Sequence, residues 1–290
     1  MSLNGVIRAL AVLSLGVLSW LPVQAAQTDQ AYDTKTQVAD TVADKLQTLT
    51  DADYHWIAQK LYQNEASQNP AYLTFWHPQE PFPSFGIGHF IWIPAGVDAP
   101  FVETFADMVA FVSAHRPPPA WLQDLYSSSQ FKPPWRDRSH FQQAQNSIEM
   151  QQLRDWLLAT ADSQARFIVQ RLVQQLAQVS QRLTQHQQAL FNRHLTALLQ
   201  TKQGVFALID YSNFKGIGFN PKETYQGEGW GLVEVLLAMP SSVTAEQAVP
   251  QFVLTAKQVL QNRVKNARPG QNETHWLPGW HKRVEGYLNE

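Results

Sequence analysis

The sequence has no cysteine, no excess of basic residues and no close set of metal ligands. The absence of cysteine from the 290 residues excludes disulfides, zinc–thiolate sites and thiol nucleophiles. The nine histidines are scattered without a His-Glu-x-x-His pattern, so the sequence predicts neither a metal site nor a cofactor. A chain without disulfides depends on its hydrophobic core, and ten tryptophans and fifteen phenylalanines supply large side chains for one.

The first 25 residues are typical of a secretory signal peptide. Arg8 is the basic start, residues 9–21 are apolar, and residues 23–25 offer the small side chains that a signal peptidase needs. The apolar run of about 13 residues is shorter than the about 20 that span a bilayer, so we expect cleavage and no stable membrane insertion. Residues 26–40 are expected to be a flexible leader. The sequence therefore predicts an exported protein, periplasmic or secreted.

The charge balance of the remaining chain bears on its partners. Without Arg8 it carries 21 basic and 24 acidic residues, a formal charge of −3. Nucleic-acid-binding proteins usually show a clear basic excess, so we expect no nucleic-acid partner. Residues 41–290 are long enough for one large core, and we expect a single elaborated domain there.

Hydrophobic periodicity predicts a mainly α (α+β) fold, with a helical body and a small β-hairpin near its N-terminus. Thr50 is expected to cap a helix that runs to about Asn64, because apolar side chains recur on one face at 54, 57, 58 and 61. Residues 72–76 and 84–93 are rich in aromatic and β-branched side chains and read as strands joined by a proline-rich loop. Further helices are expected at 101–113, 148–183, 184–199, 230–238 and 244–265, with a short one after Pro278.

Glu65 stands at the end of the first expected helix. It follows Tyr54 by eleven residues, and steps of about 100° return it to within about 20° of the same face. A carboxyl on that core-facing side loses hydration, which raises its pKa and keeps it protonated, as a general acid must be. The alternative is a helix-end glutamate that turns to solvent.

The stretch PSFGIGHFIW interrupts the second expected strand with two glycines. Gly86 and Gly88 would lie on one face, where missing side chains leave a groove that a ligand or another backbone can approach. His89 is expected to hold the local loop by hydrogen bonds, with a catalytic role as the alternative. Ser84 could position a water molecule, and Glu80 in the preceding loop is a second carboxylate within reach of the site.

Together these residues resemble the phage-type lysozymes, whose pattern is a helix-terminal Glu, a short hairpin with a second carboxylate, and then [T/S]-x-G-x-G-H. The stretch LPGWHKRVEGYL (residues 277–288) also resembles the closing Gly-x-x-x-Arg helix of that family. The resemblance implies a lysozyme-like fold that hydrolyses the β-1,4 links between the amino sugars of peptidoglycan. It implies that Glu65 protonates the leaving oxygen and that Glu80 and Ser84 orient the attacking water.

The chain also departs from the family. Ala66 and Ser67 stand where a Gly usually follows the helix-end Glu, no Arg occurs between Glu65 and Arg116, and Glu80 replaces an Asp. If no second acid approaches Glu65, a lytic transglycosylase, which uses one Glu as acid and then as base, is the alternative. Chitosanases share the layout, so the polysaccharide substrate stays open. A non-catalytic exported module that binds glycan or a protein partner is a further alternative.

The last candidate segment is the loop of residues 213–231, which holds five glycines. Aromatic side chains of this loop, Tyr225 and Trp230 among them, suit the far wall of a sugar cleft, because aromatic faces stack on sugar rings. Asn213 and Glu228 would supply hydrogen bonds to the sugar. The alternative is a glycine-permitted turn that packs on the core.

Overall fold

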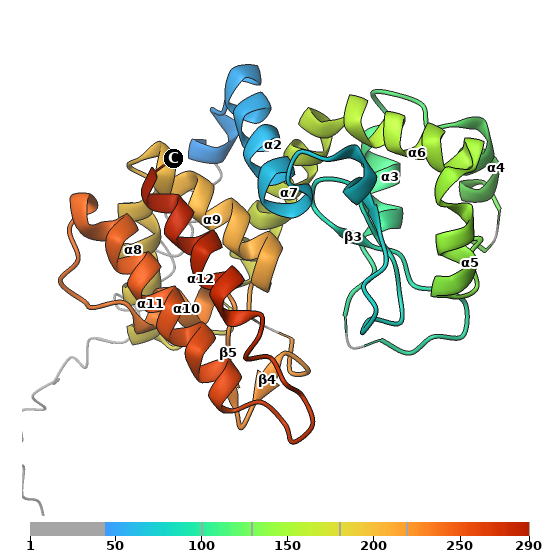
Figure 1. The fold of residues 1–290 in the computed structure, drawn as a ribbon. Coiled ribbons are helices and arrows are strands. Elements are labelled where there is room, and N and C mark those ends of the chain that lie inside the picture. Colours follow the sequence, from blue (N-terminus) through green and yellow to red (C-terminus); the bar gives the residue numbers. More distant parts are fainter. Residues whose placement is uncertain (1–43, 100, 129, 180, 219, 290) are drawn as a thin grey trace, which may run out of the picture. The chain divides into compact units, whose positions relative to one another are not determined.

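The computed structural model describes residues 44 to 289, except 100, 129, 180 and 219. The predicted signal peptide at 1–25 and the leader at 26–40 lie outside these residues. The described part is mainly helical with small antiparallel sheets (Figure 1), which confirms the mainly α prediction. None of its helices is long and apolar enough to cross a membrane.

The elements follow one another along the chain with short connections. The helices are α2 (Asp51–Ala66), α3 (Phe105–Ser113), α4 (Ala120–Tyr126), α5 (Arg138–Gln143), α6 (Ile148–Ala159), α7 (Ala161–Val179), α8 (Gln185–Leu198), α9 (Lys202–Lys215), α10 (Leu232–Ala238), α11 (Ala245–Lys265) and α12 (Leu277–Gly286). Short 3₁₀ turns are η1 (Pro70–Leu73), η2 (Ala144–Asn146) and η3 (Tyr287–Asn289). The strands β1 (Thr74–Phe75), β2 (Ser84–Phe85) and β3 (Phe90–Ile91) form one sheet, and β4 (Thr224–Tyr225) pairs with β5 (Glu228–Gly229).

Helix α2 begins and ends with clear local signals. Thr50 and Asp53 form the predicted capping box, in which each side chain accepts a hydrogen bond from the backbone N–H of the other residue, at 3.2 and 3.0 Å. The helix ends where Ser67 and Gln68 take left-handed φ angles of 49° and 55°. Its predicted apolar face is buried (Tyr54, Ile57, Ala58 and Leu61) and packs along α7. This packing against α7 fixes the position of the last turn of α2.

The single long helix predicted for 148–183 is wrong, because the structure has two helices, α6 and α7, that meet at Thr160. The Thr160 hydroxyl donates to the carbonyl of Trp156 at 2.7 Å, a back-bond that competes with regular helix geometry. Gln164, fully buried in the first turn of α7, donates to the carbonyl of Leu157 at 2.6 Å and so ties the two helices together. Neither proline nor glycine marks this break in the sequence.

The strand predicted for 84–93 is likewise wrong over its middle. Strands β2 and β3 are two residues each, and residues 86–89 form the turn between them. Gly86 and His89 have positive φ angles of 72° and 46°, which a strand does not allow. The backbone N–H of Ile87 donates to Oε1 of the buried Gln164 at 3.0 Å, so α7 fixes this turn from behind.

Helix α9 was missed by the sequence reading, which treated residue 213 as the start of a loop. Residues 204–212 are all buried, so the helix has no polar face and its sequence shows no helical periodicity. It contacts α7, α8, α10 and α11, and η3 packs on it from the C-terminal end of the chain. Because α9 ends at Lys215, it carries Asn213 to the centre of the fold as a helical residue.

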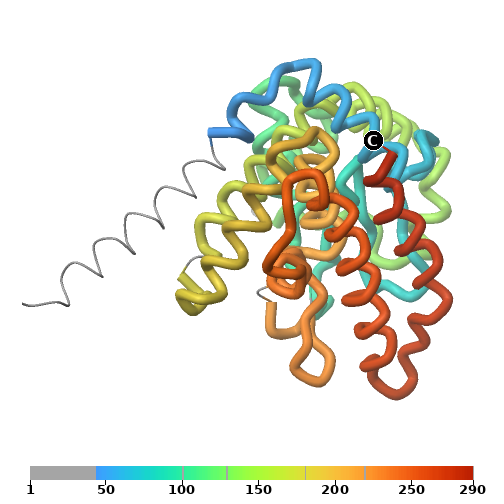
Figure 2. Tube along the Cα trace, turned by 90° about the vertical axis from the view of Figure 1, so that its left-hand side faces the viewer, coloured from blue at the N-terminus to red at the C-terminus, as the bar shows by residue number. Residues whose placement is uncertain are grey.

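The C-terminal helices surround α9 and complete the core. In Figure 2 the orange and red segments that contain α10, α11 and α12 run beside one another, in agreement with the contacts between consecutive members. Most of the buried apolar side chains of the described residues form one connected cluster, which extends from Leu46 to Tyr287. Helix α12 thus brings the closing Gly-x-x-x-Arg stretch onto the same core as α2.

Candidate functional site

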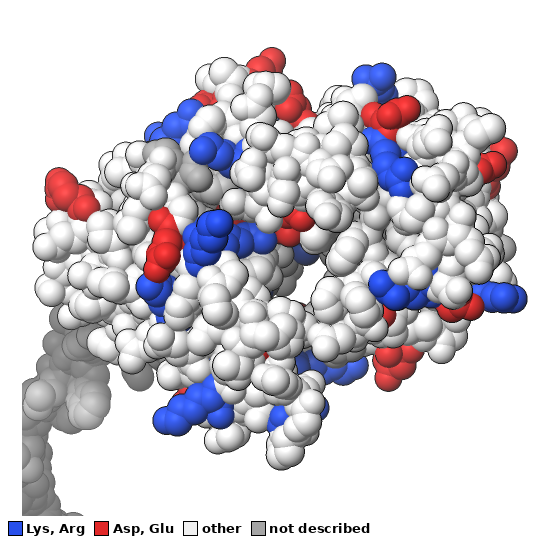
Figure 3. Space-filling model, in the orientation of Figure 1, with Lys and Arg blue, Asp and Glu red and all other residues white. Residues whose placement is uncertain are grey.

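A cavity of about 470 Å³ lies where α2, the β2–β3 turn, α7, α9 and the loop after α9 meet. Its wall contains Glu65 together with Glu80, Ser84, Gly88, His89, Asn213 and Trp230. Figure 3 shows a hollow near the middle of this face, with acidic and basic side chains at its margin. Seven of the residues singled out in the sequence are therefore brought to one cavity.

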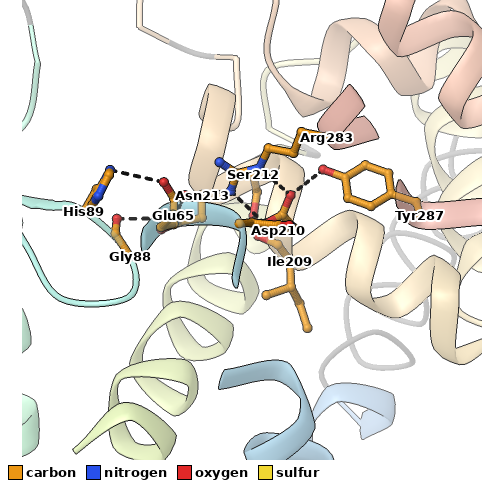
Figure 4. A network of polar contacts seen from close by, with 10 residues as sticks. Glu65, Gly88, His89, Ile209, Asp210, Ser212, Asn213, Arg283 and Tyr287 are labelled. Carbon is orange, nitrogen blue, oxygen red and sulfur yellow. Dashed lines mark hydrogen bonds and ion pairs between the residues drawn. The ribbon is translucent and has the colours of Figure 1, made fainter. Parts of the chain in front are cut away.

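Glu65 is the most firmly held side chain of this wall. Its Oε1 accepts a hydrogen bond from Nη2 of Arg283 at 2.6 Å and a longer one from Nδ2 of Asn213 at 3.4 Å. Its Oε2 lies 3.1 Å from Nδ1 of His89 (Figure 4). The side chain is only 9 % exposed. The carboxyl therefore points inward, which rules out the alternative of a helix-end glutamate that turns to solvent.

Arg283 is itself fixed by a buried acid. Asp210, in α9, is fully buried and accepts hydrogen bonds from Nε and Nη2 of Arg283 at 2.9 and 2.7 Å. The hydroxyl of Tyr287 and the amide of Asn64 also donate to Asp210, at 2.5 and 3.3 Å. Figure 4 shows Asp210 between Arg283 and Tyr287, with Glu65 on the other side of the guanidinium. One arginine thus bridges two carboxylates from α2 and α9.

This environment decides the protonation of Glu65. Burial is the largest influence and raises the pKa of the carboxyl, but the charges of Arg283 and His89 and the hydrogen bonds from Arg283 and Asn213 together outweigh it. The pKa of Glu65 therefore lies below its ordinary value. The expectation that burial alone would raise this pKa and keep the carboxyl protonated is wrong, because it did not include the buried guanidinium.

His89 and Asn213 join the hairpin turn to the helical body. Nδ2 of Asn213 donates to the carbonyl of Gly88 at 3.3 Å as well as to Glu65. His89 uses Nδ1 toward Glu65, while its Nε2 is buried and has no hydrogen-bond partner among the described residues. The imidazole therefore reaches the carboxylate itself, in addition to shaping the turn.

Glu80 and Ser84 lie in the same cavity but are held less firmly than Glu65. Ser84, in β2, is buried, and Glu80 belongs to the exposed loop before it. Within the described part of the chain no hydrogen bond fixes the Glu80 carboxyl; its backbone carbonyl accepts one from the Trp76 indole at 2.8 Å. Burial raises the pKa of Glu80. Of the two predicted catalytic carboxyls, Glu80 therefore has the higher pKa.

The expectation that Gly86 and Gly88 leave a groove for a ligand is wrong, because core side chains pack against both glycines. A Cβ added at Gly86 would lie 2.2 Å from Oε1 of Gln164, and Gly86 is outside the cavity wall. A Cβ added at Gly88 would lie 2.6 Å from the Phe90 ring. Core side chains, and not a ligand, approach both glycines closely. Gly88 still lines the cavity, and its carbonyl accepts the bond from Asn213.

The residues expected in the far wall divide into two groups. Trp230 lines the cavity, with the guanidinium of Arg263 4.0 Å from its ring centroid. Tyr225 and Glu228 do not line it. The Tyr225 hydroxyl donates to Glu273 at 3.0 Å, and the exposed Glu228 accepts from Asn266 at 2.9 Å. The expected sugar-binding role of Tyr225 and Glu228 therefore has no support in the geometry of this cavity.

The glycines of this loop make room for two carboxyls that the sequence reading did not single out. A Cβ at Gly216 would lie 3.1 Å from Glu223, and one at Gly218 or Gly229 would lie within 2.4 Å of Glu234. Glu223 lines the cavity, and burial raises its pKa. Burial, helped by the negative charge of Glu223, raises the pKa of Glu234 to about 7. The loop is therefore packed tightly, and part of it also supplies cavity wall.

Asp210 and Arg283 are the main site residues that the sequence reading missed. Asp210 gave no signal, because it lies in a buried helix without periodicity. Arg283 is the arginine of the closing Gly-x-x-x-Arg stretch and was named only as part of that pattern. Among the described residues, no cluster of His, Asp and Glu side chains could hold a metal ion.

Comparison with protein families, with characterised proteins and with solved structures finds no significant match to this chain.

Proposed function

We propose that the chain is a lysozyme-like glycoside hydrolase that cleaves β-1,4 links of peptidoglycan or a related amino-sugar polymer. The observation that carries the proposal is Glu65, a helix-end carboxyl in a cavity wall, held by Arg283 and His89. The cavity of about 470 Å³ has the size of a ligand site. Most glycosidases act through carboxyl groups beside the scissile bond. Export to the periplasm or the medium remains a prediction from the N-terminal sequence.

In this mechanism Glu65 protonates the leaving oxygen, while Glu80 and Ser84 position the attacking water. Because its pKa is lowered, Glu65 is ionised in the empty cavity at neutral pH. A general acid must carry a proton, so substrate has to raise this pKa on binding. Burial is already the largest influence and acts upward, and a sugar that displaces water from the cavity strengthens it. The proposal thus requires that Glu65 gains its proton with the substrate.

Two alternatives draw on particular observations. A lytic transglycosylase is favoured by Glu80, whose carboxyl is fixed by no hydrogen bond within the described residues, so that Glu65 would act alone. A non-catalytic glycan- or protein-binding module is favoured by the ion pair of Glu65, because a carboxylate held between Arg283 and His89 also serves a structural purpose. The products of the reaction separate these alternatives from hydrolysis.

The test is turnover of purified peptidoglycan by the protein and by Glu65→Gln, with the released fragments identified by mass spectrometry. We expect new reducing ends from the parent and a loss of at least about 100-fold in Glu65→Gln, the usual range for removal of a general acid. Glu80→Gln tests the second carboxyl. Glu228→Gln is the matched control, since this exposed side chain lies outside the cavity wall.

The other outcomes are equally informative. Anhydro-sugar ends from the parent would identify a transglycosylase. Equal turnover by the parent and Glu65→Gln would remove Glu65 from the mechanism. No turnover by any folded variant, checked by circular dichroism, would overturn lytic action on peptidoglycan. The same four proteins on chitosan then test the other polysaccharide.

A further inference from the structure

The cavity wall also contains a buried lysine that the mechanism above does not use. Lys215 is the last residue of α9, two residues after the Asn213 that contacts Glu65. Its side chain lines the cavity, although the residue is only 8 % exposed. Lysine is among the residues least often buried unless it is paired. Its position therefore requires an explanation.

Aromatic rings surround the ammonium group of Lys215. Nζ lies 3.5 Å from the ring centroid of Trp280 and 4.0 Å from that of Phe214. Ring faces attract a cation but accept no conventional hydrogen bond. Among the described residues, no oxygen accepts a hydrogen bond from Nζ and no carboxylate pairs with it. An ammonium group has three donors, and buried donors are normally satisfied.

The neighbouring carboxylates are already occupied by other cations. Glu273 forms a two-bond pair with Arg263, with both distances 2.8 Å. Asp210 and Glu65 share Arg283. Among the described residues, these pairings leave no neighbouring carboxylate to pair with Lys215. The space in front of it is the cavity itself, so an acceptor can arrive with a ligand.

The charged groups around Lys215 affect the pKa of its amine, and a bound anion would affect it too. Burial lowers the pKa of its amine well below the ordinary value, the charges of Arg263 and Arg283 lower it further, and Glu273 and Glu65 act in the opposite direction. These four groups come from α11, α12, α2 and the loop before α12. An anion that binds beside the amine favours its charged form, so binding draws a proton from solution when the amine is neutral.

We propose that Lys215 is an anion-binding subsite for a carboxylate carried by the glycan substrate, a proposal that rests on the glycan-cleaving function proposed above. A singly charged carboxylate fits better than a phosphate group, because Glu65, Glu80 and Glu223 line the same cavity and would repel a doubly charged ligand. The subsite would favour acidic amino sugars over neutral ones.

Calorimetry with matched oligosaccharides tests the subsite. The probes are a tetrasaccharide of alternating N-acetylglucosamine and N-acetylmuramic acid, its methyl ester, and the same chain with the acid extended by a short peptide that ends in a free carboxylate. We expect the free acid or the peptide form to bind at least about 10-fold more tightly than the ester, as for one charge-assisted hydrogen bond. Which of the two binds more tightly identifies the source of the carboxylate.

Variants connect this preference to Lys215. Lys215→Met keeps the packing against the two rings and should bind all three probes with affinities within about twofold of one another. Lys282→Met is the matched control, since this lysine is an exposed residue of α12 and should leave the preference intact. In the parent, titrations in two buffers with different ionisation enthalpies should show more proton uptake with the carboxylate probe that binds more tightly than with the ester, and Lys215→Met should show equal uptake with both.

An acetate titration separates failure of the subsite from failure of the glycan function. The indole N–H resonance of Trp280 should shift with saturation on addition of acetate in the parent and stay fixed in Lys215→Met. Equal affinity of the parent for all three probes, or a preference that survives Lys215→Met, overturns the subsite, as does an acetate titration without a shift. If no oligosaccharide binds but acetate does, the anion site stands and the glycan function falls.

Discussion

At the scale of single residues, the carboxyl of Glu65 experiences opposing influences. Burial drives it toward the neutral form, and Arg283 and His89 drive it toward the charged form. The net result is a lowered pKa. His89 is the more accessible of the two cationic neighbours, since its side chain is 31 % exposed and that of Arg283 10 %.

Replacement of His89 should therefore raise the pKa of Glu65. His89→Asn is the suitable change, because Asn tolerates the φ of 46° that this position requires. Loss of the neighbour at 3.1 Å removes one of the influences that lower this pKa, so the pKa should rise. NMR titration of the ¹³C-labelled glutamate side chains measures the midpoint, with Glu65→Gln used to assign the signal. An unchanged or lower midpoint would contradict this account of the site.

Glu234 makes a second residue-scale prediction, on stability and pH. Its folded pKa of about 7 lies above its ordinary value of 4.5, and its Oε2 is buried without a partner. A raised pKa favours the folded state below pH 4.5, and this contribution is lost as the pH rises from 4.5 through about 7.

Glu234→Gln removes this titration. The parent should lose about 3 kcal/mol of unfolding free energy between pH 4.5 and 7.5 relative to the variant. Urea unfolding at closely spaced pH values measures both profiles. Parallel profiles over this window would show that the Glu234 carboxyl is solvated in the folded protein.

At the scale of elements, the β2–β3 turn depends on one buried side chain of α7. Gln164 Oε1 accepts from the N–H of Ile87 and occupies the space that a Cβ at Gly86 would need. The turn presents His89 to Glu65, so its position matters to the cavity. This link joins the hairpin to the helical body from the side away from the cavity.

Gly86→Ala should destabilise the protein by more than backbone strain alone. The φ of 72° costs a non-glycine residue about 1 kcal/mol, and displacement of Gln164 adds the loss of a buried hydrogen bond, about 1 to 3 kcal/mol. Gly96→Ala is the control, since it shares a positive φ of 77° but meets no atom within 4 Å. Urea unfolding free energies compare them. Equal losses in both variants would mean that Gln164 adjusts freely.

Elements with one polar face were predictable, and those without one were not. The capping residues Thr50 and Asp53 and the apolar stripe predicted helix α2. Helix α9 did not, because burial on all sides removes the periodicity on which such predictions depend. The break at Thr160 depends on hydrogen bonds to Gln164 and neighbouring carbonyls, and no local sequence signal marks it. Within the site, Glu65, His89 and Asn213 were identified, whereas the buried Asp210 partner of Arg283 depends on tertiary packing.

At the scale of the whole described structure, Arg283 connects segments that are far apart in the chain. It joins α12 to Glu65 at the end of α2 and to Asp210 in α9, and Tyr287 adds a second bond to Asp210. Each carboxylate is deeply buried, so removal of the guanidinium leaves negative charges without compensation. The energetic effect should therefore exceed that of any exposed ion pair in the protein.

Arg283→Met should destabilise the protein by about 3 to 5 kcal/mol, the range for loss of one partner of a buried pair. Asp210→Asn in the same chain should recover part of this loss, because one of the two buried carboxylates is then replaced by a neutral group. A double-mutant cycle from urea unfolding gives the coupling energy, which we expect to exceed 1 kcal/mol. Lys257→Met, which breaks the more exposed pair with Glu285, is the control and should change stability by less than about 1 kcal/mol. Additive losses would show that Arg283 and Asp210 act independently.

The position of Arg283 in the sequence also sets the order in which the site is completed during synthesis. Glu65, His89, Asp210 and Asn213 leave the ribosome well before residue 283. Until that arginine emerges, the two carboxylates of α2 and α9 have no shared counter-ion, and each opposes burial of the other. The cavity therefore reaches its final electrostatic state only when α12 docks, a step that follows the synthesis of α2 and α9.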